Sequence, residues 1–349
     1  MQILDYMCKH GHEQLIIQID KRSALKAVMA IHDTTFGPAL GPARMAIYRS
    51  EHEAILESLR FSQSQTYKYI AAGLPFSGGR IIVIGDPSTD KSENLVRALG
   101  RFVEFMSGRY IITGGGAGFT DEDTSILVKE TSHIIGIPSA LGGSGEPALY
   151  AAYGVYLGMK VCAQMVFGSD SLKNRTIALQ GFGKVGSALA KYLQKEGAIM
   201  MVSDIRSEAV EIAREHLGAE IVDSTIIYDV MCDIFSPCAW SGVLNKDTIP
   251  RLKCKIVAGP ANNQLDDRET DSIALQERGI VYIPDYIINV GGFINITSEI
   301  EGYEPNEVKK KIKKTISSNI EKILSCSTTE GRTPLQVADS LIEERIQQA

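Results

Sequence analysis

The chain has 349 residues, of which 44% are hydrophobic and 22% charged, as in an ordinary globular protein with about two domains. Its net charge of −6 argues against nucleic-acid binding, because neutralising phosphates requires a surplus of clustered Lys and Arg. Apolar stretches are interrupted before they could span a bilayer, and the first residues lack the apolar segment of a signal peptide, so we expect a cytoplasmic protein without a membrane partner. The six cysteines form no C-x-x-C pair, which predicts reduced thiols and no metal site.

The first part of the chain mixes strand-like and helical patterns. Strands are expected over 13–19 and 81–84, and helices over 50–65 and 92–106, which predicts a mixed α/β domain. A segment rich in glycine and proline follows over 139–147. It can continue neither a helix nor a central strand, so it is expected to mark a domain boundary.

The second part alternates strands and helices, a pattern typical of a doubly wound parallel sheet. The expected order is a helix over 148–167, a strand over 176–180, a helix over 184–196, a strand over 198–204 and a helix over 208–216, with further buried strands over 234–235, 255–258 and 281–284. The last stretch, 308–348, is amphipathic and helical, and we expect it to pack back on the first domain. The fold class is therefore α/β, with an N-terminal mixed domain and a C-terminal Rossmann domain.

A glycine motif between the strand over 176–180 and the next helix is the strongest chemical signal. It consists of Gly181, Phe182, Gly183, Lys184, Val185 and Gly186. The glycines permit a tight turn, close approach of main chain to a diphosphate, and close helix packing. Asp204, with Ile205 beside it, ends the next strand, where a carboxylate accepts hydrogen bonds from ribose hydroxyls and repels a 2′-phosphate. The motif predicts NAD binding in preference to NADP, although Arg206 leaves limited tolerance of NADP open. The alternative is a Rossmann domain that kept its glycines for packing alone.

Several further segments carry a resemblance to a known family. They are 32–40 (HDTTFGPAL), 66–68 (TYK), 85–87 (GDP), 152–155 (AYGV), 232–238 (CDIFSPC), 263–265 (NQL) and 284–292 (PDYIINVGG). From about residue 12 to 346 the chain resembles the Glu/Leu/Phe/Val (amino-acid) dehydrogenases, most of all the leucine-type members. The resemblance implies a domain for substrate binding and oligomerisation, residues 1–140 plus 327–349, and an NAD-binding Rossmann domain, residues 141–326. It also implies a homo-oligomer that interconverts an L-amino acid and its 2-oxo acid, with hydride transfer to NAD and release of ammonia.

The resemblance also implies roles for individual residues. Lys68 matches the lysine that pairs with the substrate carboxylate, with a solvated surface lysine as the alternative. Asn263 matches an asparagine at the substrate end of the cleft, or it caps a loop. The pocket for the substrate side chain maps to Leu40, Gly114, Phe293 and Ile296, although Phe293 could equally be core packing.

Two positions depart from the family at its reaction centre. Arg80 stands where the family has its catalytic lysine, and Gly116 where it has its catalytic aspartate. An arginine stays charged at any working pH and is a poor proton carrier, while glycine offers no carboxylate. Because a general acid or base typically contributes about 10²- to 10⁴-fold in rate, ordinary oxidative deamination is expected to be impaired or altered.

Two hypotheses on function follow. The first is an NAD-dependent oxidoreductase acting on a hydrophobic amino acid, an imine or a 2-oxo acid, in which Arg80 holds an anion and Glu146 replaces the missing acid. Reduction of a preformed imine would need no activated water. The acidic run over 121–123 is another candidate acid, or a helix N-terminus that favours negative charge. The second hypothesis is a pseudoenzyme or non-redox enzyme that binds NAD or an amino acid in a regulatory or biosynthetic role.

Overall fold

The computed structural model describes residues 2–348, which fold into two compact units. Unit 1 consists of the chain up to Glu146, the segment Ile294–Pro305 and the end of the chain from Arg345. Unit 2 consists of Pro147–Phe293 and Asn306–Glu344. Each unit has its own six-stranded sheet, so the predicted α/β class with two domains is confirmed.

The sheet of unit 1 is mixed, with strand order β1-β2-β4-β3-β5-β6. β1 pairs antiparallel with β2 and β2 with β4, whereas the remaining neighbours are parallel. The strands are β1 (Gln14–Asp20), β2 (Leu25–Ile31), β3 (Ala39–Ala46), β4 (Ser77–Ile84), β5 (Tyr110–Gly115) and β6 (Ile134–Ile135). The helices are α1 (Ile3–His10), α2 (Glu51–Ala72), α3 (Glu93–Phe105) and α4 (Asp121–Leu127).

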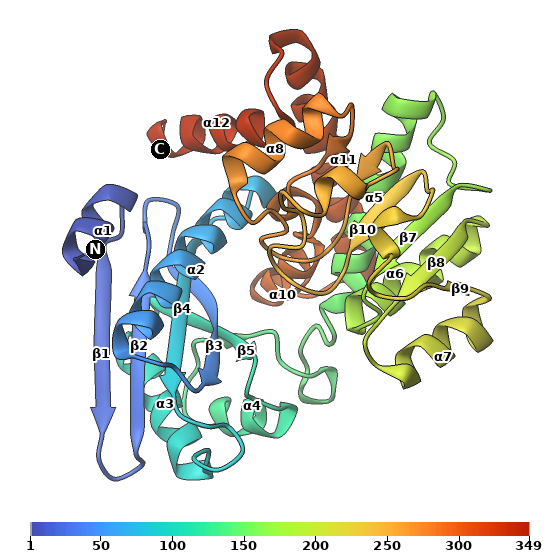
Figure 1. Cartoon of the computed structure of the whole chain (residues 1–349). Helices are drawn as coiled ribbons and strands as arrows, with labels where there is room; N and C mark the ends of the chain where they lie inside the picture. The colour runs from blue at the N-terminus through green and yellow to red at the C-terminus, as the bar shows by residue number, and fades with distance from the viewer. Residues whose placement is uncertain (1, 349) are drawn as a thin grey trace. The chain divides into compact units, whose positions relative to one another are not determined.

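The two faces of this sheet are covered by different helices. On one face Ile81 and Val83 of β4 join a hydrophobic core with Leu95 and Leu99 of α3. On the other face α2 lies along β4 (Figure 1) so closely that a Cβ added to Gly78 would come 1.8 Å from a carbonyl oxygen of α2. Because side chains alternate along a strand, Arg80 points to the α2 face.

The sheet of unit 2 is parallel throughout, with order β12-β11-β10-β7-β8-β9, which confirms the predicted Rossmann topology. Its strands are β7 (Thr176–Gln180), β8 (Ile199–Ser203), β9 (Glu220–Ile221), β10 (Ile234–Pro237), β11 (Ile256–Val257) and β12 (Val281–Tyr282). Its helices are α5 (Ala148–Phe167), α6 (Lys184–Glu196), α7 (Ser207–Leu217), α8 (Arg268–Glu277) and α9 (Asp285–Ile288). Three further helices are shared: α10 (Gly291–Glu301) begins in unit 2 and ends in unit 1, α11 (Pro305–Glu330) lies in unit 2 from Asn306, and α12 (Pro334–Gln347) lies in unit 2 up to Glu344.

The C-terminal helices, which we expect to pack on the first domain, are grouped with unit 2 for most of their length. Residues 306–344 belong to unit 2, because the apolar face of α11 packs on α5. At Gly158 of α5, an added Cβ would lie 2.9 Å from the Cδ1 atom of Ile320 in α11. The expected domains, 1–140 plus 327–349 and 141–326, stay a prediction, and the two compact units are divided after Glu146, around Ile294–Pro305 and after Glu344.

Unit 1 is completed by residues from late in the chain. The Glu299 carboxylate accepts hydrogen bonds from the backbone N–H groups of Gly136, at 2.9 Å, and Ser144, at 2.6 Å. The Arg345 guanidinium donates to the carbonyl of Ile70 at 2.9 Å. That carbonyl lies in the last turn of α2, which contains no basic residue of its own, so Arg345 supplies the positive charge that a helix C-terminus favours.

Candidate functional site

The glycine-rich loop of unit 2 joins β7 to α6 and requires glycine for different reasons at each position. Gly181 has a left-handed φ of +108°, and a Cβ added there would lie 2.7 Å from the Cβ of Ala239. A Cβ on Gly186 would lie 2.5 Å from the Gly181 carbonyl oxygen, so α6 starts directly against the loop. At Gly183, by contrast, nothing lies within 4 Å of an added Cβ. The loop therefore leaves open space at its middle glycine alone.

The start of α6 suits an anion. Gly183 is the N-cap of this 13-residue helix and provides no side-chain hydrogen bond to its first turn. The first N–H groups of a helix have no partner within the helix, and the helix dipole places partial positive charge there. The cradle at Gly183 and these N–H groups thus fit the diphosphate of a dinucleotide.

Asp204 follows β8 directly and is bonded to the loop. Its carboxylate accepts from the N–H of Phe182 at 2.7 Å and from the N–H and Nε of Arg206 at 2.9 and 3.0 Å. Burial opposes the charge on Asp204, but the hydrogen bonds from Arg206 and Phe182 outweigh it and hold the pKa of the carboxyl below its usual range. Asp204 is therefore an ionised acceptor at neutral pH.

A cavity of about 380 Å³ lies at the carboxyl ends of β10, β7 and β8, neighbours in the sheet, a size within the usual range of ligand pockets. Four expected residues line it: Gly181, Gly183, Asp204 and Ile205. Phe182 and Gly186 are buried, and Lys184 and Val185 belong to the first turn of α6. The remaining lining residues are Gln180, Ser203, Arg206, Ser224, Cys238, Ala239 and Trp240.

Most of these additional residues were missed by the sequence reasoning. One signal could have found Cys238, Ala239 and Trp240, because they directly follow β10 at the edge where parallel sheets bind ligands. Ser224 follows the two-residue strand β9, which is too short to be recognised from its pattern.

In unit 1, Arg80 is enclosed by side chains of α2. Its guanidinium carbon lies 4.5 Å from the ring centroid of Phe61, and its Nη2 lies 4.0 Å from the Glu57 carboxylate. The Arg80 side chain is 7% exposed, and its Nε atom is buried without a hydrogen-bond partner. Burial lowers the pKa of Arg80 from its usual value, partly offset by Tyr110 and Glu57. Glu57 makes a closer ion pair, of 2.9 Å, with Arg44.

Lys68 lies on the same helix as these partners of Arg80. Glu57, Phe61 and Lys68 are spaced by four and seven residues, which places them on one face of α2. Lys68 is only 4% exposed, so the alternative of a solvated surface lysine is wrong. The structure therefore brings a buried lysine and a buried arginine to one face of the unit 1 sheet.

Gly116 lies where two stretches of main chain touch. A Cβ added to Gly116 would lie 2.2 Å from the carbonyl oxygen of Ala43 in β3, and 3.2 Å from the Cβ of Pro42. A carboxylate at this position would require β3 or the loop to move. The close contact between these two stretches of backbone thus leaves no room for an acidic side chain at position 116.

The acidic run over 121–123 forms the first turn of α4. Thr120 and Asp123 form a reciprocal capping box, and Asp123 also pairs with Lys91 at 2.7 Å. These bonds favour the helix N-terminus interpretation of the acidic run.

The other expected residues fall in both units. In unit 1, Leu40 of β3 is fully buried, Ile296 packs beside Gly136, and Glu146 is exposed. In unit 2, Phe293 is half-buried, and Asn263 has a left-handed φ of +51° with its carbonyl accepting from Gly242 at 2.8 Å. Their predicted roles toward a substrate stay predictions.

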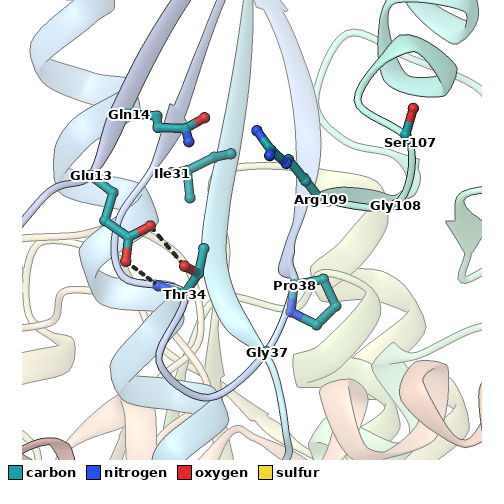
Figure 2. A pocket seen from close by; sticks show the side chains of 9 residues that line it. All are labelled: Glu13, Gln14, Ile31, Thr34, Gly37, Pro38, Ser107, Gly108 and Arg109. Carbon is teal, nitrogen blue, oxygen red and sulfur yellow. Dashed lines mark hydrogen bonds between the residues drawn. The ribbon is translucent and has the colours of Figure 1, made fainter.

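A second cavity, in unit 1, contains none of the expected site residues. Figure 2 shows Arg109 and Glu13 among the nine residues lining its volume of about 500 Å³. The Glu13 carboxylate already accepts from the N–H and hydroxyl of Thr34, both at 2.8 Å. Within residues 2–348 no group of three or more His, Cys, Asp and Glu side chains is placed to hold a metal ion, and no helix is long and apolar enough to cross a membrane.

Comparison with known proteins gives matches along the whole chain. The family described as "Glu/Leu/Phe/Val dehydrogenase, dimerisation domain" matches residues 13–133, and "Glutamate/Leucine/Phenylalanine/Valine dehydrogenase" matches residues 202–349. The leucine dehydrogenase of Thermoactinomyces intermedius is 48% identical over 347 residues, covering 99% of this chain and 94% of that one. The phenylalanine dehydrogenase of Lysinibacillus sphaericus is 45% identical over 328 residues, 91% of this chain and 86% of that one. The crystal structure of L-tryptophan dehydrogenase from Nostoc punctiforme superposes with a TM-score of 0.83 at 36% identity, covering 99% of both chains.

Proposed function

We infer the function from the family: the chain belongs to the Glu/Leu/Phe/Val dehydrogenases and is an oxidoreductase of the amino-acid dehydrogenase type, with NAD as its cofactor. Beyond this, we propose that its substrate is a hydrophobic amino acid, the corresponding imine or the 2-oxo acid. The relatives named for leucine, phenylalanine and tryptophan support a hydrophobic side chain.

The observation that carries the proposal is the pocket of unit 2. The open space at Gly183, the uncapped start of α6 and the ionised Asp204 supply a diphosphate cradle and a ribose acceptor side by side. When bound, NAD supplies a hydride acceptor. The carboxylate of Asp204 would repel the additional phosphate of NADP, which supports a preference for NAD.

In unit 1, Lys68 is the anchor for the substrate carboxylate in this proposal. Its burial at 4% exposure makes a charge-assisted hydrogen bond stronger than it would be in water. Leu40 and Ile296, both buried and apolar, are candidates for the pocket of the substrate side chain, and Gly114 and Phe293 are further candidates. Asn263 is a candidate hydrogen-bond partner of the substrate.

Arg80 acts in this proposal as a fixed positive charge. Enclosed by Phe61 and Glu57, it can orient an anion but cannot exchange a proton near neutral pH. Glu146 is the candidate proton donor, since position 116 has no room for a side chain. Oxidative deamination, which needs an activated water, would then be slow, whereas reduction of a preformed imine would not need that water.

The test is calorimetric titration with NAD⁺ and NADH, followed by an absorbance scan of hydrophobic amino acids, their 2-oxo acids and cyclic imines. We expect NAD to bind more tightly than NADP, with Asp204→Ala weakening NAD about 10- to 100-fold, as for loss of hydrogen bonds to a charged group. Imine reduction is expected to exceed leucine oxidation. Absence of nicotinamide binding would refute the proposal.

A second candidate function is a pseudoenzyme, favoured by the contact between Gly116 and Ala43 and by the enclosure of Arg80. The pseudoenzyme hypothesis predicts tight NAD binding without turnover of any amino acid, oxo acid or imine in the same absorbance scan. Turnover of one such substrate at a rate that falls in Lys68→Ala would decide against it.

Assembly and location complete the proposal. The family description of residues 13–133 as a dimerisation domain supports a homo-oligomer, which sedimentation of the purified protein would test. The six cysteines are free thiols, which supports a reducing, cytoplasmic location.

A further inference from the structure

Two cysteines of unit 2 lie opposite one another at the amino ends of neighbouring strands. β10 pairs with β11 in parallel from their first residues onward, and an isolated parallel bridge between Met231 and Lys253 keeps the same register ahead of both strands. Cys232 and Cys254 each follow this bridge by one residue, so they stand directly opposite in the register. Paired residues of parallel strands point to one face and lie about 4.8 Å apart, within the roughly 4.4 to 6.8 Å that a disulfide spans between Cα atoms.

The two thiols also contact each other through a hydrogen bond. The Cys232 thiol donates to the Cys254 sulfur, which raises the pKa of Cys232 and holds that of Cys254 below its usual value although burial opposes it. Arg278, whose Nη2 donates to the Leu252 carbonyl at 2.7 Å, adds a positive charge that lowers the pKa of Cys254 further. By contrast, burial raises the pKa of Cys162 to about 12. Because the thiolate is the form that attacks a disulfide, the pair is more reactive than a single buried thiol.

The two cysteines differ in their access to solvent. Cys232 is partly exposed, whereas Cys254 is only 6% exposed. Met231, which precedes Cys232, is 71% exposed, and Lys253, which precedes Cys254, is exposed as well. A small molecule in solution therefore meets Cys232 first, and Cys254 lies beside it under cover. One accessible thiol with a second thiol next to it is the arrangement of an attacking and a resolving cysteine.

This pair of thiols is separate from the cavity beside the glycine-rich loop. Cys232 precedes β10, whereas Cys238 follows β10 and lines that cavity at the carboxyl end of the strand. The chain between the two residues is largely extended and spans about 20 Å. The chemistry of Cys232 and Cys254 can therefore be tested without NAD or an amino acid, whatever reaction the protein catalyses.

From this arrangement we propose that Cys232 and Cys254 form a reversible disulfide site that reacts with low-molecular-weight disulfides. When the pair has lost one proton, transfer of the other along the hydrogen bond to Cys254 leaves the thiolate on Cys232. This thiolate attacks one sulfur of the small disulfide, whose S–S bond breaks and releases one small thiol. Cys254 then attacks the Cys232 sulfur of the mixed disulfide and releases the second small thiol. Two protein thiols are thus oxidised, the small disulfide is reduced, and the two protons pass to the leaving sulfurs.

The test treats the full-length natural protein with oxidised glutathione, blocks the remaining thiols with iodoacetamide in denaturant, and maps the cysteines by mass spectrometry. Cleavage after aromatic and basic residues places the three nearest cysteines in separate peptides: 229–235, 236–240 and 254–255. We expect the first and the third of these peptides to be joined by a disulfide, and dithiothreitol to separate them again. Cys8 is exposed and should take up glutathione, so it reports that the oxidant was active.

Variants separate the two roles. Cys254→Ser should accumulate glutathione on Cys232, because the second step is lost, whereas Cys232→Ser should leave Cys254 as a free thiol, because burial keeps the oxidant away. Cys326→Ser is the matched control, since Cys326 is also partly exposed, and it should keep the cross-link. Thermal melting shows whether each variant is folded.

The map of the natural protein decides the assignment even if a variant fails to fold. If Cys8 is modified while Cys232 and Cys254 stay unlinked, either as two thiols or with glutathione held on Cys232, the assignment is wrong. A disulfide between Cys238 and Cys254 would overturn it as well, because the pairing would then not follow the register of β10 and β11.

Discussion

Gly183 in unit 2 and Gly116 in unit 1 both stand at motif positions, yet their surroundings are opposite. Around Gly183 an added Cβ would meet no atom within 4 Å, whereas at Gly116 it would lie 2.2 Å from the carbonyl oxygen of Ala43. One glycine leaves open space at the start of α6, and the other lets two stretches of main chain meet. A glycine at a motif position can therefore mark either open space or a close contact between two stretches of main chain.

The largest effect is expected at Gly116. Substitution by Ala or Asp should lower the free energy of unfolding by about 3 kcal/mol or more, because the clash is with backbone that cannot rotate away. Urea unfolding of the variant and the natural protein measures this loss in the free energy of unfolding. Gly73→Ala is the control, since Gly73 has a left-handed φ of +64° but open space, and should cost only about 1 kcal/mol.

Combined with a substitution at Arg80, the aspartate variant of Gly116 also tests the oxidation of leucine. Arg80→Lys combined with Gly116→Asp should not increase leucine oxidation, because a carboxylate at position 116 would have to displace β3. A stable double variant with a gain of about 10²-fold or more would show that the two positions alone block the reaction.

Acid should destabilise unit 1 through His12. Burial is the main cause that lowers its pKa to about 4, so between pH 6.5 and 4 the unfolded chain holds a proton that the folded chain lacks. Stability is thus present above pH 6.5 and falls as the pH drops toward 4, by about 3 kcal/mol for this group.

Urea unfolding at pH 7, 5.5 and 4 measures this loss. His12→Gln should flatten the pH dependence, because an amide can still donate to the Leu59 carbonyl that lies 2.8 Å from the His12 Nε2 atom. Nearby His10 and His32, whose pKa values burial also lowers, should leave a residual slope. An equal flattening by His52→Gln, at an exposed histidine, would contradict the assignment.

Gly183→Ala should separate binding from stability. Its φ of −81° suits any residue, so the free energy of unfolding should change by less than about 1 kcal/mol. NAD affinity should fall about tenfold or more, because the methyl group occupies the space into which main chain and diphosphate approach. Unchanged affinity in calorimetry would remove Gly183 from the binding site.

The smallest effect is expected at Arg80. Arg80→Met should lower the free energy of unfolding by only about 1 kcal/mol, because the loss of about 2 kcal/mol for a buried cation over an aromatic ring is partly offset by removal of the unpaired Nε atom. Glu57 keeps its 2.9 Å partner Arg44, so it is not left unpaired. A loss of about 3 kcal/mol or more in urea unfolding would mean that Glu57 depends on Arg80 instead.

Periodic elements of the fold were predictable, and elements with mixed patterns were not. The helices expected over 92–106, 148–167 and 184–196 match α3, α5 and α6 to within a residue. β3 was not predicted, because Gly41 and Pro42 stand in its middle and are rare in strands. Its position beside β4 comes from tertiary pairing.

The site shows the same limit. A role for Gly181 and Asp204 could be predicted from the sequence because motif and strand are adjacent in the chain, and both residues line one cavity. The obstruction at Gly116 could not, since the atom that it would meet belongs to Ala43, a residue remote in the chain. Which side chains enclose Arg80 likewise depends on how α2 lies on β4.

The late residues of unit 1 bear on how the protein is made. Translation produces the first 146 residues well before Glu299, whose carboxylate binds Gly136 and Ser144, and Arg345, which binds the end of α2. While the ribosome is still at work, the nascent first unit therefore lacks these hydrogen bonds, although all six strands of its sheet have already been made. A ribosome-bound chain stalled before Glu299 should be cleaved by proteases near residues 136–144. The released full-length chain should resist cleavage at the same residues.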